Sequence, residues 1–377
     1  MQYDVVMYFY WAPAQIVHKY LSLHNKLRDS CKVLTIIGQD EFGITAQQFS
    51  HFSDEYLEDV KLATVSEALR LLSENDYKLA VFSSNGRKGF VNPDGTEPPA
   101  LGAKFPNVGK DIAIARSKGA KTLQISEMIT DFYYAGAEIV SLVSPAMKDI
   151  HLNPSKFKTY HTYQWRPFDA RPEPEYIYSN CLLWERNGDC LPYMSKSDFC
   201  AKYGLDANKQ IYVYLPSKAQ HVMHGVAKDV YKKVCSMENV VVKYHPTEYT
   251  RLAANRIDNK WSKDLCGVPD VPALDPLDTH WCYEYADCAI TNQSSVSIEL
   301  PLYDTPFLYV QPTNFALSNF FLRFGHSCGL DEIEDFLSNK KYLNKIENLD
   351  EFYDTIMFNT KQKSSDILCA QIKGLIK

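Results

Sequence analysis

The chain has 377 residues, about twice what one hydrophobic core usually organises, so its length excludes a single small domain and favours two domains. Apolar residues make up 45% of the chain and charged residues 23%, with 16 Gly and 19 Pro, and this composition excludes a disordered or fibrous protein. The 40 Lys and Arg residues against 46 Asp and Glu residues give a net charge of −6 without a sustained basic run, so no nucleic-acid partner is expected.

Strand and helix patterns alternate through the first half of the sequence. Short β-branched or aromatic runs alternate with amphipathic stretches, which is typical of parallel strands joined by crossover helices. We expect strands at 3–10, 32–38, 79–83, 121–126 and 138–143. We expect helices at 14–28, 65–73 and 108–118, the last ended by Gly119.

A connector divides the chain, and the same alternation resumes after it. Between 152 and 177 the periodicity stops and Pro and Tyr accumulate. We therefore expect an N-terminal Rossmann-like domain at 1–155, a linker at 156–178, a second Rossmann-like domain at 179–345 and a helical segment at 346–377. In the second domain we expect helices at 196–203, 222–236, 247–255, 279–285 and 295–303, and strands at 210–215, 239–244, 271–274, 288–291 and 307–310. The fold class is α/β, with two doubly wound domains facing a cleft.

No metal site, disulfide framework or transmembrane segment is expected. No run of about 18 apolar residues occurs, and the N-terminus reaches Asp4 without a signal-like basic region. We expect a cytoplasmic protein that can lie peripheral to the membrane where its acceptor is made. The ten Cys are irregularly spaced, which predicts reduced and mostly buried thiols. His221 and His224 are three residues apart, but no third metal ligand is evident nearby.

The most informative polar residues of the second domain follow the expected strand at 288–291. They are Thr291, Gln293, Ser294, Ser295 and Ser297. Free backbone N–H groups and hydroxyls at the start of a helix form a site suited to phosphate. Glu299 lies about one turn after Ser295, where its carboxylate can accept hydrogen bonds from a ribose diol. The alternative is that the serines only cap the helix and Glu299 is solvated.

Two further strand ends carry phosphate-compatible side chains. The strand at 239–244 delivers His245 to its carboxyl end, where a histidine can bond or protonate a phosphate oxygen. The strand at 210–215 is followed by Ser217 and Lys218, and the Lys218 ammonium can neutralise a diphosphate. Three successive strand ends of this kind favour a ligand site over coincidence.

These motifs resemble those of a known group of enzymes. Lys-Tyr-His-Pro at 243–246, Ala-Asp-Cys-Ala-Ile-Thr-Asn-Gln-Ser-Ser at 286–295 and the following Glu299 are similar to the donor-domain motifs of GT-B glycosyltransferases. The resemblance is to the CDP-glycerol glycerophosphotransferases and the capsule-type transferases with a His-Pro motif, and it covers 205–312 well. It implies that the second domain holds a nucleotide donor, the first an acceptor, and that a C-terminal helix crosses back.

The resemblance also implies roles for single residues. His245, Ser294 and Ser295 would contact the donor phosphates, Glu299 the nucleoside, and His280 the nucleobase. The sequence departs from the glycerophosphotransferases at 123–131, which lacks their His-Gly-x-Pro-Leu-Lys stretch and contains no histidine. This departure favours sugar transfer over polyol-phosphate transfer.

Sugar transfer to a hydroxyl with inversion requires a general base. Glu127 is the first candidate because it directly follows an apolar strand, and Asp131 is the second, although it can instead cap the next helix. Both acids can also simply solvate a loop.

We therefore expect a glycosyltransferase that moves a sugar from an NDP- or CMP-sugar donor to a hydroxyl of a glycan or a lipid-linked polysaccharide precursor. No cofactor and no obligatory metal ion is expected. The alternatives are a CDP-polyol phosphotransferase, a non-hydrolysing nucleotide-sugar 2-epimerase and a non-catalytic protein that binds sugar nucleotides. The sequence leaves the sugar, the nucleobase and the stereochemistry open.

Overall fold

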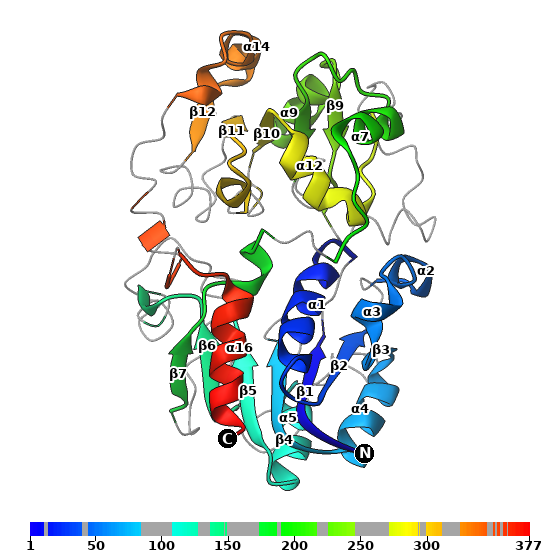
Figure 1. The fold of residues 1–377 in the computed structure, drawn as a ribbon. Helices are drawn as coiled ribbons and strands as arrows, with labels where there is room; N and C mark the ends of the chain where they lie inside the picture. Colours follow the sequence, from blue (N-terminus) through cyan, green and yellow to red (C-terminus); the bar gives the residue numbers. More distant parts are fainter. Residues whose placement is uncertain are drawn as a thin grey trace. The chain divides into compact units, whose positions relative to one another are not determined.

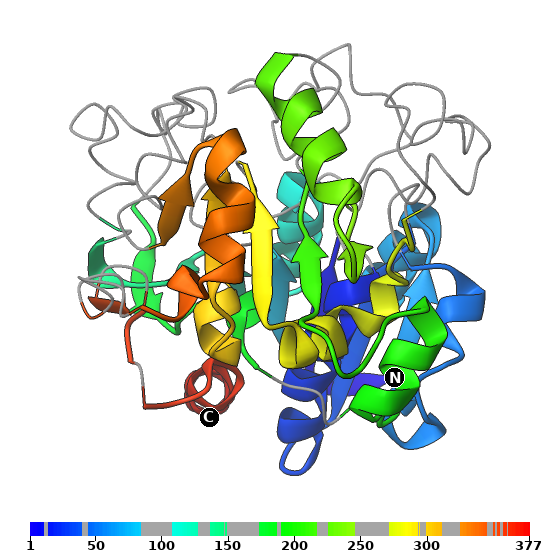
Figure 2. The same cartoon turned by 90° about the horizontal axis from the view of Figure 1, so that it is seen from above.

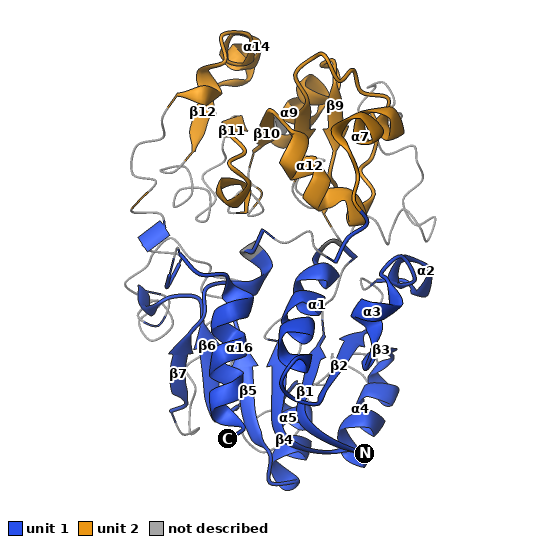
Figure 3. Ribbon diagram, in the orientation of Figure 1, with its two compact units in different colours: residues 1–192, 353–377 blue, residues 193–352 orange. Residues whose placement is uncertain are grey.

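The chain forms two compact units (Figures 1 and 3). In this computed structural model the described residues are 1–10, 14–39, 44–83, 108–126, 136–146, 148, 173–186, 190–216, 225–245, 271–292, 294, 299–310, 325–344, 350, 353–354, 357–359 and 361–377. Unit 1 comprises Met1–Pro192 and Tyr353–Lys377, and unit 2 comprises Tyr193–Phe352. Within the described ranges no helix has the length and apolar character needed to cross a bilayer.

Unit 1 is built on a seven-stranded parallel sheet with the order β3-β2-β1-β4-β5-β6-β7. The strands are β1 (Gln2–Phe9), β2 (Val33–Gly38), β3 (Val60–Ala63), β4 (Asp76–Ser83), β5 (Lys121–Ile125), β6 (Ile139–Leu142) and β7 (Glu175–Tyr178). The helices are α1 (Ala14–Arg28), α2 (Ala46–Phe49), α3 (Asp54–Leu57), α4 (Val65–Glu74), α5 (Val108–Ser117) and α16 (Ser364–Leu375), with a 3-10 turn at Leu182–Trp184. The strand order reverses between β1 and β4, which makes their carboxyl ends a topological switch point.

Helices cover both faces of this sheet, which explains why its strands are apolar runs. Alternate residues of β1 point to opposite faces. Tyr8 belongs to the core formed with α4 and α5, whereas Phe9 stacks on Tyr20 of α1 at a centroid distance of 3.9 Å. In Figure 1, α1 and α16 lie side by side on the same face of the sheet.

The structure divides the chain at a different place from the expected linker at 156–178. Glu175–Tyr178 is the edge strand β7, paired in parallel with β6, and unit 1 continues to Pro192. β7 has the sequence Glu-Tyr-Ile-Tyr and is only half-buried, so it lacks the continuous apolar run of an inner strand. Its identity as a strand therefore depends on its pairing with β6.

Two buried polar side chains hold the C-terminal segment on unit 1. Asn180, with a left-handed φ of 60°, accepts hydrogen bonds at Oδ1 from the backbone N of Phe358 (2.6 Å) and Asn359 (2.8 Å). Its Nδ2 donates to the backbone O of Asn359 (2.7 Å) and of Gln362 (3.1 Å). The buried Glu185 carboxylate accepts from the backbone N (2.7 Å) and Oγ (2.6 Å) of Ser365, so it satisfies donors in the first turn of α16.

Unit 2 is built on a five-stranded parallel sheet with the order β12-β11-β10-β8-β9. The strands are β8 (Tyr212–Tyr214), β9 (Val240–Val242), β10 (Cys288–Thr291), β11 (Phe307–Val310) and β12 (His326–Cys328). The helices are α7 (Lys196–Tyr203), α9 (Gly225–Cys235), α12 (Thr279–Tyr285) and α14 (Ile333–Ser338), with 3-10 turns at Pro276–Asp278, Leu300–Tyr303, Leu330–Glu332 and Lys341–Leu343. α9 and α14 share one hydrophobic core on one face of the sheet, and α7 and α12 pack together on the other (Figure 2).

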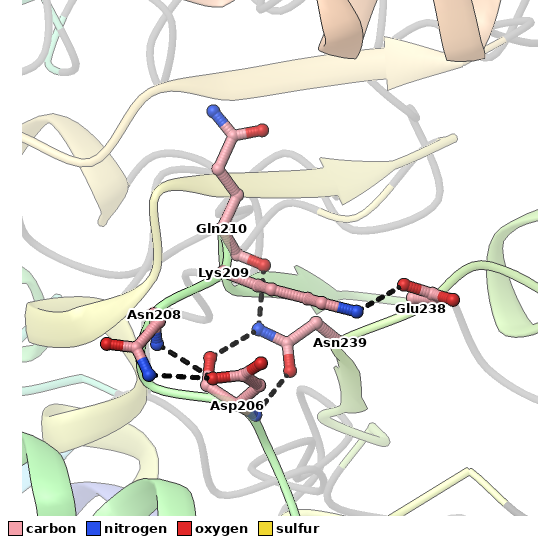
Figure 4. Close-up of polar contacts among 6 residues, drawn as sticks. All are labelled: Asp206, Asn208, Lys209, Gln210, Glu238 and Asn239. Atoms are coloured by element: carbon pink, nitrogen blue, oxygen red, sulfur yellow. Dashed lines mark hydrogen bonds and ion pairs between the residues drawn. The ribbon is translucent and has the colours of Figure 1, made fainter.

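A polar lock fixes the loops that lead into β8 and β9 (Figure 4). Asn239 adopts a left-handed φ of 60°, and its Oδ1 accepts from the backbone N of Asp206 at 2.7 Å. Its Nδ2 donates to the backbone O of Asp206 (3.0 Å) and of Gln210 (2.8 Å). Lys209 and Glu238 add an exposed ion pair of 2.8 Å across the same two loops. The lock therefore ties together the starts of β8 and β9.

Two expected elements of unit 2 differ from the structure, one is not tested by it, and one strand was not expected. The stretch 271–274 makes an isolated bridge between Ala273 and Val242 rather than a strand. The described part of the helix expected at 295–303 is the 3-10 turn Leu300–Tyr303, and the helix expected at 247–255 lies outside the described residues. The short half-exposed β12 was not predicted, because three residues without a buried run carry no strand pattern.

Candidate functional site

The carboxyl ends of β8 and β10 form the topological switch point of unit 2. β8 is the first strand of this sheet, with β9 on one side and β10 on the other. Open α/β sheets bind ligands outside the carboxyl ends of their strands at such a point. The pairings of β8 with β9 and with β10 are parallel, so Leu215, Lys243 and Asn292 follow their strands at the same edge.

Thr291, the last residue of β10, shapes this edge. Its buried Oγ1 donates to the backbone O of Leu215 at 2.8 Å and accepts from the backbone N of Ser294 at 2.9 Å. The side chain therefore ties the ends of β8 and β10 together and fixes the turn that follows. The backbone N–H of Ser294, which the sequence assigned to an anion, already donates to Thr291.

The side chain of Asn292 is buried without a hydrogen-bond partner among the described residues, and a bound ligand would explain this. It directly follows β10 and is 0% exposed. Its Oδ1 and its Nδ2 both have no hydrogen-bond partner in the structure as described. A buried polar group left unsatisfied costs about 1–3 kcal/mol, and native proteins rarely keep one without a functional reason. The amide offers one acceptor and one donor, so it complements a ligand group that can do both, such as a hydroxyl.

Asn292 lies within the motif at 286–295, but it is not among the site residues expected from the sequence. The available signal was its position as the first polar residue after a fully buried strand. Its lack of a partner could not be read from the sequence, because it depends on what surrounds the side chain in space.

His245 and Ser294 lie at the same edge but are not on neighbouring strands. His245 is half-buried and follows β9, while Ser294 follows β10, and β8 runs between these two strands. Two inter-strand spacings correspond to about 10 Å. A ligand that contacts both residues would therefore have to extend across the end of β8.

Lys243, also after β9, is buried, and its backbone N donates to Tyr214 O at 2.9 Å. Burial raises the pKa of Cys282 on α12, and the Lys243 charge partly offsets that rise.

His280 and Glu299 occupy different environments. His280 is buried on α12, with Nδ1 3.0 Å from the Tyr303 hydroxyl and its ring edge-on to Trp281. These contacts pack α12 against the 3-10 turn. Glu299 is half-buried and immediately precedes that turn.

The remaining predicted site residues lie outside the described residues. They are Glu127, Asp131, Ser217, Lys218, Gln293, Ser295 and Ser297, together with the histidine pair His221 and His224. Their roles remain predictions. Within the described ranges, no group of three or more His, Cys, Asp or Glu is arranged to hold a metal ion.

Unit 1 has its own polar cluster at its switch point, and the sequence did not reveal it. The backbone N of Tyr10, after β1, donates to Oγ of Ser83 at the end of β4 (3.1 Å). The Tyr10 hydroxyl lies 2.5 Å from Oδ2 of Asp111 on α5. Burial raises the pKa of Asp111 to about 7, although the Tyr10 hydrogen bond and the Lys110 charge lower it. The carboxyl group therefore exchanges its proton near neutral pH.

Comparisons with known proteins define the fold class. No protein-family model matches the chain, and no curated protein sequence matches it significantly. The UDP-GlcNAc 2-epimerase of Neisseria meningitidis, solved with UDP-GlcNAc, is similar in structure with a TM-score of 0.57 and 10% identity, over 99% of this chain and 100% of that one. The MnaA–UDP complex of S. aureus has a TM-score of 0.56 and 10% identity, over 98% and 96%.

A third similar structure is the wall teichoic acid polymerase TagF soaked with CDPG. It has a TM-score of 0.53 and 11% identity, over 99% of this chain and 88% of that one. At this level of identity the likeness shows the fold alone. The protein has a GT-B fold, with two parallel-sheet α/β domains and a C-terminal helix that returns to the first.

Proposed function

We propose that the protein is a glycosyltransferase that binds a nucleotide-activated sugar at the carboxyl edge of unit 2 and transfers the sugar to a hydroxyl of a glycan or cell-surface polysaccharide precursor. The observation that carries the proposal is the buried, unpartnered Asn292 amide at the switch point, beside the Thr291 bridge. The similar structures support a sugar-nucleotide ligand, since they were solved with UDP-GlcNAc, UDP and CDPG.

In this proposal the chain's own groups stabilise the departing phosphate. His245 and Lys218 supply positive charge or a proton, and Ser295 supplies a hydroxyl and a backbone N–H. No metal ion is obligatory. Glu127, or Asp131 in its place, takes the acceptor proton when the configuration inverts. Asn292 holds a hydroxyl of the donor.

The second candidate is a non-hydrolysing nucleotide-sugar 2-epimerase. The UDP-GlcNAc 2-epimerase and the MnaA–UDP complex align with almost the whole chain. Their TM-scores of 0.57 and 0.56 are higher than the 0.53 of TagF. An epimerase isomerises the donor by proton transfer on the sugar itself. Incubation with donor alone separates the candidates, because isomerised sugar nucleotide without acceptor favours the epimerase and an unchanged donor favours the transferase.

Ligand binding is tested by a thermal-shift panel of CMP, CDP, UDP, GDP and TDP. A ligand present at 100 times its Kd stabilises the folded protein by about 2.7 kcal/mol. We expect one base to shift the melting temperature of the wild type, and Glu127→Gln to keep that shift while losing turnover. A shift without consumption of any nucleotide sugar, unchanged in Glu127→Gln, would indicate a non-catalytic binding protein.

The role of Asn292 is tested by Asn292→Leu with Asn25→Leu as a matched control. The Asn25 amide on α1 is also buried with neither polar atom partnered in the described structure, but it lies in unit 1. Replacing an unpaired buried amide by an apolar group is expected to stabilise the free protein by about 1–3 kcal/mol in both variants. Only Asn292→Leu should lose the nucleotide-induced shift. A full shift in Asn292→Leu would refute the assignment of Asn292 to the ligand.

A further inference from the structure

Two thiols lie at the last turn of α1. Cys31 follows this helix, and its Sγ donates to the backbone O of Leu27 at 3.1 Å. Cys369 lies on α16, and its Sγ donates to the backbone O of Lys26 at 3.3 Å. The two sulfur atoms therefore bond to the carbonyl oxygens of consecutive residues in the last turn of α1.

An ion pair between α1 and α16 lies beside the two thiols. Lys26 of α1 forms an ion pair with Asp366 of α16, one turn before Cys369. Burial raises the pKa of Cys31, the negative charge of Asp4 raises it further, and the Lys373 ammonium opposes the rise. The geometry itself brings the thiols close, since the carbonyl oxygens of Lys26 and Leu27 are neighbours in one helical turn and each accepts from one of the two sulfur atoms.

The two thiols also differ in access. Cys31 is half-exposed, whereas Cys369 is buried at the contact between α16 and α1. An oxidant from solvent therefore reaches Cys31 first, and Cys369 is the neighbouring thiol that can resolve the oxidised sulfur.

We propose that Cys31 and Cys369 are a disulfide-forming pair that fastens α16 covalently to the end of α1 when the protein meets a hydroperoxide. The Cys31 thiolate attacks a peroxide oxygen, the O–O bond breaks, the second oxygen takes up a proton and leaves as water, and Cys31 becomes a sulfenic acid. The Cys369 thiolate then attacks the Cys31 sulfur, an S–S bond forms, the S–O bond breaks and water leaves. Two thiols and one hydrogen peroxide give one disulfide and two water molecules. The proposal is independent of the sugar-nucleotide function.

The disulfide would act on the segment that Asn180 and Glu185 already hold by hydrogen bonds. It would close a loop from residue 31 to residue 369, nearly the whole chain, and long loops gain most from a cross-link. Because the thiolate is the reactive form and burial raises the pKa of Cys31, the reaction should accelerate as the pH rises above neutral.

The test uses the full-length protein treated with hydrogen peroxide, blocked with N-ethylmaleimide and digested without reductant. Mass spectrometry should find a peptide pair linking Cys31 to Cys369 that dithiothreitol separates. Cys369→Ser should leave a Cys31 sulfenic acid that reacts with dimedone. The half-buried Cys328 of unit 2 provides the control, since Cys328→Ser should form the link as the wild type does.

A readout of α16 accompanies the peptide map. The oxidised wild type should melt at a higher temperature than the reduced form and show slower amide exchange across 364–375, and neither change should occur in Cys31→Ser. The peptide map of the wild type needs no variant, so it remains decisive if a variant folds poorly. Oxidation of Cys31 without any link to Cys369, or a link between Cys31 residues of two molecules, would overturn the proposal.

Discussion

Replacing Asn180 with Ala is expected to release the C-terminal segment from unit 1. The Asn180 side chain is almost fully buried and makes four hydrogen bonds with backbone groups of Phe358, Asn359 and Gln362, at 2.6–3.1 Å. Its backbone is left-handed, with a φ of 60°. Alanine removes all four hydrogen bonds and tolerates the left-handed conformation less well than Asn does.

The expected cost follows from these two contributions. Each hydrogen bond contributes about 1 kcal/mol net, and a left-handed conformation costs a residue with a β-carbon about 1–2 kcal/mol. The four hydrogen bonds together contribute about 4 kcal/mol, and the poorer tolerance of Ala for this backbone adds up to about 1 kcal/mol, so Asn180→Ala should lower the free energy of unfolding of unit 1 by about 4–5 kcal/mol. Asn180→Gly loses the same hydrogen bonds without the backbone strain, so it should cost about 1 kcal/mol less than Ala.

Hydrogen exchange resolved by peptide is the suitable assay, because a chain of two units need not unfold in one step. The amides of 357–369 should lose protection in Asn180→Ala, and urea unfolding followed on unit 1 should shift to lower concentration. Asn208→Ala is the control, since this exposed amide bonds only locally to Asp206 and should change stability by less than about 0.5 kcal/mol. Unchanged protection at 358 and 359 together with a loss below about 1 kcal/mol would refute the clamp.

Two predictions concern pH. Burial lowers the pKa of His24 to about 4. In the neutral ring Nε2 carries the proton, because it faces the carbonyl O of Glu58, and Nδ1 accepts a hydrogen bond from the Thr35 hydroxyl. The unfolded chain protonates this histidine near pH 6.5, so the free energy of unfolding of unit 1 should fall by up to about 3 kcal/mol between pH 6.5 and 4. Urea titrations of His24→Gln should show a weaker dependence of this free energy on pH. The raised pKa of Asp111 acts in the opposite direction, since stability falls as pH rises from about 4 to about 7. Asp111→Asn keeps an acceptor for Tyr10, and its gain over the wild type should be about 4 kcal/mol larger at pH 8 than at pH 4; an equal difference at both pH values would contradict this.

Several elements could be predicted from the sequence to within a residue. The helix at Ala14–Arg28 and the strands at Cys288–Thr291 and Phe307–Val310 have the predicted bounds. Each of them contains a continuous apolar run or a clear apolar stripe, and that information is local. The α/β class with two parallel-sheet domains followed from the same alternation and is confirmed.

The candidate site was only partly accessible to such reasoning. The carboxyl edge of unit 2 could be foreseen, because polar residues follow its buried strands and the strand ends of a parallel sheet share one edge. The order of the strands is not local, however, and β8 separates His245 from Ser294. The bond from Thr291 to Leu215 joins residues 76 positions apart, and no pattern at either residue indicates it.

The sequence by itself determined the class of fold and led to the proposal of a ligand at the carboxyl edge of unit 2, because hydrophobic periodicity and polar strand ends are properties of short segments. Tertiary structure decided that 175–178 is a strand, that Asn180 clamps residues 358–362, that Asn292 is buried without a partner, and that Cys31 lies near Cys369. Each of these features depends on contacts between residues that are distant in the sequence. Strand pairing and burial exist only once the chain has folded.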